Sequence, residues 1–386
     1  MSEDVGLDVS VLMDVMESGD IEARFILARQ IAGLYADPDT PQIEREQVLP
    51  VVMKLAVDEN FDVRQVLAEE LSTVVDLPAD VLFAVVADTE EISLPFIATT
   101  MCMQATHMHA ILRVGDDVRQ AAIARRPDIT SDVAAYIIAH GKLGGCLAIL
   151  DNRAIQFSVD DLRQLYARHG NAAEMAERLL VMPTLPSDVR ITQLRRTASR
   201  MRQLMAERCW LPANEALDLV TDAEDATVLR ILVEANEDEV PHTVTYLASK
   251  DLLTPSLMVR AAVQGELRTV EILFSHLTGF ARSKVAGNLF GGKPSAFQSM
   301  FRKSGLPKTC YGIVRAACEV QAEARGDGIR MDGESFGRRL LEALMTRYES
   351  LTVMDREKQI DFLGRYAEGK IKHIAQRLKS DFARAA

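Results

Sequence analysis

The chain has 386 residues, 48% of them hydrophobic, so it is long enough for two or three compact domains or one array of repeats and lacks the composition of a disordered protein. Its five cysteines are widely spaced and form no C-x-x-C pair, which gives no support to a disulfide framework or a zinc knuckle. The formal net charge of −12, with no continuous basic footprint, argues against general nucleic-acid binding.

The amino-terminal part of the chain carries most of the acidic charge. Residues 1–100 contain 21 acids and 5 bases, a net of −16, so the other 286 residues sum to +4. The first 20 residues are acidic and their apolar residues are interrupted by Asp, unlike an export signal, and no window has 18 uninterrupted apolar residues. We therefore expect a cytoplasmic protein without a membrane span, whose acidic region attracts a basic partner.

Helical periodicity dominates the chain, and no segment has the sustained alternation of a strand bounded by hairpin turns. Apolar residues at helical spacing form one stripe in residues 61–75 and another in residues 334–351. The first stripe comprises Phe61, Val63, Val66, Leu67, Leu71, Val74 and Val75, and the second Phe336, Leu340, Leu341, Leu344, Met345, Tyr348 and Leu351. The sequence predicts an all-α protein.

Two short phrases recur along the chain and predict helix starts. LPADV at 77, ITSDV at 129 and LPSDV at 185, with the looser FSVDD at 157 and LPANE at 211, place Pro, Ser or Thr near a cap and an acid in the first turn. From 129 onward they are 28, 28 and 26 residues apart. The second phrase, Asp-Val-Arg, opens amphipathic segments at 62, 117 and 188, as is typical of HEAT-type units in which Asp caps the helix and Arg bridges neighbouring turns. This spacing predicts a HEAT-like α-solenoid of stacked helical hairpins.

The order of the phrases resembles that of a bacterial family known as a domain of unknown function with HEAT-like helices. The resemblance rests on VRQVLAEEL, ADTEEISLPFI, VRQAAIARRPDIT, CLAILDNRAIQFSVDDL and LLVMPTLPSDV, which cover residues 55–200, and on FQSMFRKSGLP at 297–307. It implies a helical-repeat fold, and it brings no activity, cofactor or catalytic residue to transfer.

The segment MCMQATHMH places Cys102, His107 and His109 among methionines, as a soft-metal site would. On a helix the two histidines point about 200° apart, so they do not chelate one ion, and we expect the methionines to fill the core. No G-x-S-x-G, H-E-x-x-H or H-R-D pattern is present elsewhere. We therefore expect no metal, no cofactor and no catalytic residue.

Composition divides the chain into three predicted parts. Six arginines between 190 and 208 make a basic helix, expected to be a solvated connector, after which LPANE restarts the repeat. Three glycines in 323–335 predict a linker or loop. We expect helical repeats in 1–205, a second repeat segment in 206–325, and a terminal helical pair or cap in 326–386.

GNLFGGKPS at 287–295 comes within one residue of the phosphate-binding pattern G-x-x-x-x-G-K-[ST], because Pro294 replaces the serine or threonine. A working loop of this kind follows a buried strand and uses that hydroxyl to hold magnesium, whereas an amphipathic helix is predicted before this one. We therefore predict a turn in which the glycines free the backbone and Pro294 begins the next helix.

The best candidate for a binding site is the basic stretch between Glu271 and Glu319, which contains no acid. It includes a predicted helix start, where an anion is favoured. The residues predicted to bind a partner or an anion are Arg282, Lys284, Lys293, Arg302, Lys303 and Lys308.

The predicted function is that of a non-catalytic, regulatory scaffold or adaptor that binds a protein partner and no nucleic acid. The alternative is a ligand-responsive regulator that binds a phosphorylated or nucleotide-like anion near residues 282–315. A homo-oligomer in which the acidic and basic regions meet also stays open. An enzyme would need polar residues that converge in a concave pocket, which the sequence does not indicate.

Overall fold

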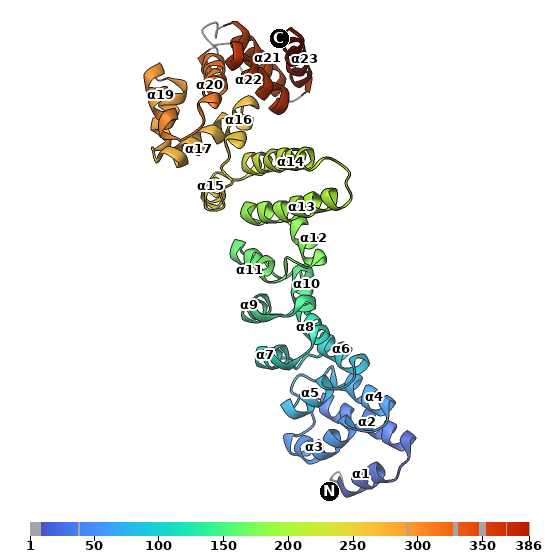
Figure 1. The fold of residues 1–386 in the computed structure, drawn as a ribbon. Helices are drawn as coiled ribbons and strands as arrows, with labels where there is room; N and C mark the ends of the chain where they lie inside the picture. The colour runs from blue at the N-terminus through green and yellow to red at the C-terminus, as the bar shows by residue number, and fades with distance from the viewer. Residues whose placement is uncertain are drawn as a thin grey trace. The chain divides into compact units, whose positions relative to one another are not determined.

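The computed structural model describes residues 9–37, 39–291, 293–326, 331–346, 353–367 and 369–385. The regular structure of these residues is entirely helical, with 23 α-helices, one short 3-10 helix (η1) and no strand in the described ranges (Figure 1). The predicted all-α class is confirmed. The chain divides into two compact units, which meet in sequence between Leu185 and Pro186.

The first unit contains twelve helices arranged in two layers. The even-numbered helices from α2 to α12 each pack on the next even-numbered helix, and odd-numbered helices form the second layer (Figure 1). The stacking is that of a solenoid-like fold. The helices are α1 (Val9–Glu17), α2 (Ile21–Ala36), α3 (Gln42–Ala56), α4 (Phe61–Leu71), α5 (Ala79–Val86), α6 (Glu90–Thr99), α7 (Ala105–Val114), α8 (Asp117–Ala124), α9 (Ser131–His140), α10 (Leu143–Asp151), α11 (Val159–His169) and α12 (Ala173–Val181).

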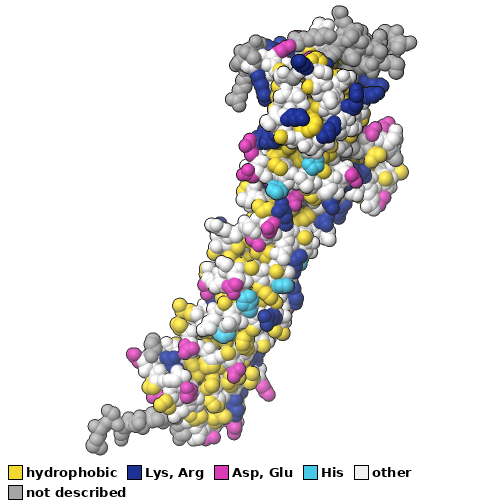
Figure 2. Space-filling view, turned by 90° about the vertical axis from the view of Figure 1, so that its left-hand side faces the viewer, with side chains coloured by type: hydrophobic (Ala, Val, Ile, Leu, Met, Phe, Trp, Pro, Cys, Tyr) yellow, Lys and Arg dark blue, Asp and Glu magenta, His cyan; other side chains and the backbone are white. Residues whose placement is uncertain are grey.

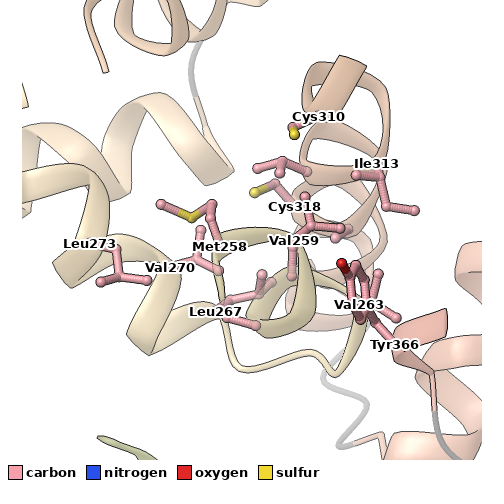
Figure 3. Packing of buried hydrophobic residues seen from close by; sticks show 14 of the residues in the cluster. Met258, Val259, Val263, Leu267, Val270, Leu273, Cys310, Ile313, Cys318 and Tyr366 are labelled. Atoms are coloured by element: carbon pink, nitrogen blue, oxygen red, sulfur yellow. The ribbon is translucent and has the colours of Figure 1, made fainter. Parts of the chain in front are cut away.

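The second unit contains the remaining α-helices and η1. The helices are α13 (Ser187–Glu207), α14 (Ala213–Glu234), α15 (Glu239–Ser249), α16 (Pro255–Val263), α17 (Leu267–Thr278), α18 (Arg282–Phe290), α19 (Pro294–Lys303), η1 (Lys308–Cys310), α20 (Tyr311–Gly326), α21 (Gly333–Thr346), α22 (Val353–Tyr366) and α23 (Gly369–Ala385). Buried side chains of α16, α17 and α20 gather in one apolar cluster, which includes Met258, Leu267 and Cys318 (Figure 3).

The predicted helix starts are confirmed. The recurring phrase precedes or overlaps the first residue of α5, α9, α11, α13 and α14. Helix α7 begins between the phrases at 77 and 129. Its N-cap is a glutamine, Gln104, so the phrase is absent there. The N-cap residues are Pro78, Gln104, Thr130, Ser158, Pro186 and Pro212, which are 26, 26, 28, 28 and 26 residues apart.

The expectation that the Asp of the Asp-Val-Arg phrase caps its helix is wrong, because the cap is the residue one or two positions earlier. In α4 the cap is Asn60, whose Oδ1 accepts a hydrogen bond from the N–H of Asp62 at 2.9 Å. In α8 the cap is Asp116. The adjacent Asp117 instead accepts a hydrogen bond of 2.6 Å from the N–H of Gly144 on α10, so it joins two repeats.

Donor side chains cover the carbonyl groups that a helix leaves unpaired at its C-terminal end. Arg126 is 4% exposed and donates to the carbonyl oxygens of Ile97 and Thr100 on α6 and its C-cap. Asn152 donates to the carbonyl of Ala124, the last residue of α8, at 2.8 Å. Contacts of the same kind join Arg119 to the carbonyl of Val86, Gln120 to that of Leu112 and Arg168 to that of Ile138. These donors connect helices that stack in the first unit.

Both predicted apolar stripes face the core in their central parts. In the first, Phe61 is 38% exposed and Val75 is 72% exposed, because Phe61 begins α4 and Val75 lies beyond its end. In the second, Met345 is 37% exposed, and Tyr348 and Leu351 lie outside the described residues. The buried members are Val63, Val66, Leu67, Leu71 and Val74 in the first stripe, and Phe336, Leu340 and Leu344 in the second.

The division between the compact units precedes α13, whereas the first predicted domain boundary, 205/206, falls inside that helix. The segment expected to be a linker, 323–335, includes residues 327–330, which lie outside the described residues. After it come three helices, α21 to α23, where a helical pair or cap was expected. They pack on one another and on α16 and α20.

Candidate functional site

The six basic residues predicted as a site all lie between α18 and η1. Arg282 and Lys284 are in the first turn of α18, Lys293 is the N-cap of α19, Arg302 and Lys303 end α19, and Lys308 begins η1. All six are exposed. Figure 2 shows Lys and Arg side chains, with fewer Asp and Glu, on the side of the second unit where α17 and α19 lie in Figure 1.

A turn between α17 and α18 places an aromatic side chain among these cations. Gly279 ends α17 in the left-handed conformation, with a φ of 69°, which glycine adopts without strain. The hydroxyl of Ser275 then donates to the carbonyl of Phe280 at 2.7 Å, and the N–H of Phe280 donates to the hydroxyl of Thr278 at 3.3 Å. The turn thereby fixes the backbone of Phe280 beside the start of α18.

The ammonium groups of two predicted lysines lie over the ring of Phe280. The ammonium nitrogens of Lys284 and Lys303 each lie 4.1 Å from the centroid of its ring, so they lie within twice that distance of each other. At an exposed site each cation–π contact contributes about 0.5–1 kcal/mol. Repulsion between two charges at the largest separation that these distances allow, about 8 Å, costs about 0.5–2 kcal/mol, depending on the solvent screening, and more at a shorter separation. The ring therefore offsets part of the cost of bringing the two ammonium groups together.

One acid lies near this cluster, and it pairs with Arg282. The Nε of Arg282 lies 3.1 Å from an Oε of Glu271, whose side chain is 17% exposed. Among the described residues, neither Lys284 nor Lys303 pairs with a carboxylate. The two ammonium groups therefore leave a positive charge that an anion from outside the chain can neutralise.

The other predicted residues are not brought into the cluster. Within the described ranges, Lys293, Arg302 and Lys308 contact neither the Phe280 ring nor a carboxylate. They add positive charge to the surrounding surface. We define the basic surface as Lys284 and Lys303 on Phe280, together with Arg282.

Sequence analysis missed the aromatic residues of this region. Besides Phe280, the ring of Phe290 at the end of α18 lies 4.5 Å from the guanidinium carbon of Arg325 on α20. Both phenylalanines flank α18 in the sequence, ten residues apart, next to glycines. An aromatic residue beside a turn in a basic stretch is the signal that could have found them.

The stretch GNLFGGKPS has the predicted structure. Its first half ends α18, Gly291 is the C-cap, and Pro294 is the first residue of α19. Gly292 lies outside the described residues. Helix α18 stands where a phosphate-binding loop would have a strand, so this segment does not have the strand–loop–helix geometry of such a loop.

Cys102, His107 and His109 each have a different protein neighbour. Cys102 is buried, and burial raises the pKa of its thiol. The ring of His107 packs edge-on against that of Phe83, with the centroids 5.8 Å apart. The Nε2 of His109 lies 3.0 Å from a carboxylate oxygen of Asp132 on α9. Cys102 thus has a local neighbour, Thr100, while the two histidines take part in separate contacts between helices.

The fold and this surface define an all-α protein of stacked helices with an exposed cluster of cations. The chain belongs to a bacterial family described as "Uncharacterised protein conserved in bacteria (DUF2336)", whose model matches residues 92–353. The predicted resemblance is confirmed, and the match includes the region between 200 and 297, which the quoted motifs did not cover. No curated protein and no solved structure matches the chain. Among the described helices, none has the length and apolar content that a membrane span requires.

Proposed function

We propose that this chain is a non-catalytic helical-repeat adaptor that binds a protein partner through an acidic segment of that partner. The observation that carries the proposal is the pair of ammonium groups on the Phe280 ring, for which the described chain supplies no carboxylate. A regulatory role and a cytoplasmic location belong to the same proposal.

An acidic peptide segment has the chemistry that this surface would recognise. A carboxylate placed near Lys284 and Lys303 forms charge-assisted hydrogen bonds and removes the repulsion between the two lysines. The half-buried ring of Phe280 offers apolar area to a neighbouring aliphatic side chain of the same segment. Because the lysines are exposed, the binding would be fast, moderate in strength and weakened by salt.

The stacked helices are suited to this role. Repeats that contact mainly their neighbours expose long surfaces along the array, and such surfaces serve binding without any catalytic group. An adaptor of this kind acts by holding a partner in place or away from its target. The basic surface supplies the charge that selects an acidic partner over a neutral one.

The test is the affinity of the full chain for a short, fluorescently labelled peptide in which Glu alternates with Leu. The Lys284→Glu/Lys303→Glu variant should bind this probe at least about tenfold more weakly in a fluorescence anisotropy titration. The control is Lys370→Glu/Lys372→Glu on α23, which makes the same change in net charge on another helix and also removes the 3.8 Å ion pair of Lys370 with Glu334. Equal losses in the two double variants would show that net charge alone attracts the probe, and the proposal would fail.

The Phe280→Leu variant separates positioning from charge. It keeps both lysines but removes the ring on which they rest. Because these contacts already exist in the free chain, their loss weakens peptide binding only through the lost ordering of the lysines, so we expect a roughly two- to fivefold lower affinity. Unchanged affinity would mean that the arrangement of the lysines on the ring does not contribute.

The same cations suit the alternative function, a regulator that responds to a phosphorylated ligand. A ligand that binds only the folded chain raises its melting temperature by mass action. If ATP or inorganic phosphate stabilises the wild type but not Lys284→Glu/Lys303→Glu, and the acidic peptide does not bind, the result supports the alternative over the adaptor.

A further inference from the structure

Helices α13 and α14 form a hairpin that is unusually long for this chain. They have 21 and 22 residues and are joined by residues 208–212 (Figure 1). From 199 to 215, none of the described side chains is buried. The part of the hairpin nearest the turn therefore contributes little to the core of the second unit. We call residues 195–224 the distal hairpin.

The distal hairpin exposes large apolar side chains. Met201 and Leu204 are three residues apart, so they share one face of α13. The exposed large apolar residues are Met201 at 40%, Leu204 at 45%, Trp210 at 64%, Leu211 at 37%, Leu217 at 53% and Leu219 at 55%. Trp210 is the single tryptophan of the sequence. Apolar side chains that gather on an exposed surface in this way mark a site of association.

The two helices of the distal hairpin carry opposite charges. The distal part of α13 and its C-cap have five arginines, whereas residues 213–224 of α14 have four acids and no base. The arginines are Arg195, Arg196, Arg200, Arg202 and Arg208, and the acids are Glu215, Asp218, Asp222 and Glu224. Within one chain the two helices already attract each other, because Arg195 and Arg202 pair with Glu224 at 3.3 and 3.1 Å.

We infer that the distal hairpin is a dimerisation surface, on which a second copy of this chain packs with its α13 facing α14 of the first. A two-fold interface uses the same patch on both copies, so that patch must complement itself. A hairpin with one basic and one acidic helix meets this condition, since the two-fold axis places each basic helix against an acidic one. The four helices then enclose the exposed apolar residues, as in a four-helix bundle.

A second copy fits this surface better than a lipid bilayer does. Trp210 and Leu211 at the turn, with arginines nearby, have the composition of a membrane-inserting tip. However, Glu207, Glu215 and Asp218 lie close to the same turn in the sequence, and anionic lipid headgroups repel them. A second copy instead supplies an arginine-rich helix for the exposed Glu215 and Asp218. The other two acids, Asp222 and Glu224, already pair with arginines of the same chain.

The first experiment is sedimentation velocity of the full chain over about 0.1–100 µM, a range that covers common dissociation constants of dimers. The expected result is a shift from a mass of 42.7 kDa to twice that mass. Because Trp210 is the single tryptophan, its emission should move to shorter wavelength over the same concentrations as the ring becomes buried. A monomer at every concentration, or a dimer that leaves Trp210 emission unchanged, would overturn the inference.

Matched substitutions locate the interface. Leu204→Glu should weaken the dimer at least about tenfold without unfolding the chain, since this side chain is exposed. The control is Val233→Glu, which places the same carboxylate at a 41% exposed position of α14 outside the distal hairpin. Equal effects of the two variants would place the interface elsewhere. Blue-shifted Trp210 emission from a monomer on vesicles of phosphatidylcholine and phosphatidylglycerol would identify a membrane contact instead.

A charge exchange tests which helices face each other. Arg200→Glu makes α13 less basic, and Asp218→Arg makes α14 less acidic, so each variant alone should dimerise more weakly than the wild type. A mixture of the two should recover dimers, because the changed helix of each copy then meets one of opposite charge. If the mixture stays monomeric, α13 does not face α14 of the partner copy.

Discussion

The buried guanidinium of Arg126 allows a sharp test of how the helices of the first unit are joined. Arg126 donates to the carbonyls of Ile97 and Thr100, at 2.9 Å in the second case, and also pairs with Asp128 at 2.8 Å. The N–H of Met101, which would normally bond to the Ile97 carbonyl, bonds instead to Ser72 at 3.0 Å. We predict that Arg126→Met, which keeps an apolar stem but removes every donor, destabilises the first unit strongly.

The magnitude follows from the groups that the substitution leaves unpaired. Each buried carbonyl without a donor costs about 1–3 kcal/mol, so two cost about 2–6 kcal/mol. The side chain of Asp128 is 52% exposed and becomes hydrated when Arg126 is removed, so the loss of this ion pair adds little to the decrease in stability. The expected decrease in the free energy of unfolding is therefore about 2–6 kcal/mol, nearly all of it from the two carbonyls left without a donor.

Urea unfolding followed by far-UV circular dichroism measures this decrease, and hydrogen exchange of α6 and α8 shows where it acts. The matched control is Arg125→Met, since Arg125 is the exposed residue next to Arg126, at the C-cap of α8. If Arg126→Met is no more destabilising than Arg125→Met, the guanidinium is not what satisfies these carbonyls, and the reasoning is refuted.

The pH dependence provides an independent check. The hydrogen bond from Arg126 lowers the pKa of Asp128 below its ordinary value in the folded chain. A carboxyl whose pKa is lower when folded stabilises the fold above its unfolded pKa, at about 3.9, and this contribution is lost as the pH falls through the folded pKa. The stability difference between wild type and Arg126→Met should therefore narrow below about pH 4.

Two further predictions concern cysteine and aspartate side chains. In the folded chain only the thiol of the exposed Cys209 should react with an aromatic disulfide reagent, because burial raises the pKa of the other four thiols, that of Cys318 to about 12. After denaturation all five thiols should react. Two or more rapidly reacting thiols in the folded chain would contradict this. Hydrogen bonds from Thr130 and then His109 lower the pKa of Asp132 to about 2, so this carboxylate favours the fold above pH about 4 and loses its effect toward pH 2. The Thr130→Val substitution should raise the Asp132 pKa in an NMR titration, and an unchanged midpoint would rule out Thr130 as its main cause.

The starts of helices could be predicted from the sequence because they depend on local chemistry. Proline fixes the backbone angle φ of the N-cap in α5, α13 and α14, and Ser158 with Asp161 satisfies N–H groups within four residues in α11. The start of α7 was missed because its N-cap, Gln104, is a glutamine, which is not one of the residues expected at a helix cap. The packing of each even-numbered helix on the next could not be read directly, because it depends on contacts between residues far apart in the chain.

The candidate site was predicted in its charges but not in its geometry. The absence of acids between Glu271 and Glu319 identified the basic stretch, because net charge is a property of composition. Which two of the six cations come together depends on the turn at Gly279, which places Phe280 between α17 and α18. Similarly, the arginines of α13 were expected to be solvated, whereas Arg195 and Arg202 both pair with Glu224. Their partner lies on the next helix, beyond the reach of a periodicity argument.

The repeats of the first unit make the same kind of contact with different residues. In each case a side chain donates a hydrogen bond to a carbonyl at the end of a stacked helix, and arginine, asparagine and glutamine all do so in this chain. Because these side chains differ in length, the carbonyl groups can be reached by a donor at different distances between stacked helices. Helix starts tolerate less variation, because the cap requires a particular backbone angle or a short acceptor. This contrast explains why the repeats are recognisable at their caps, where the sequence phrases recur, while the contacts that join one repeat to the next leave no common motif.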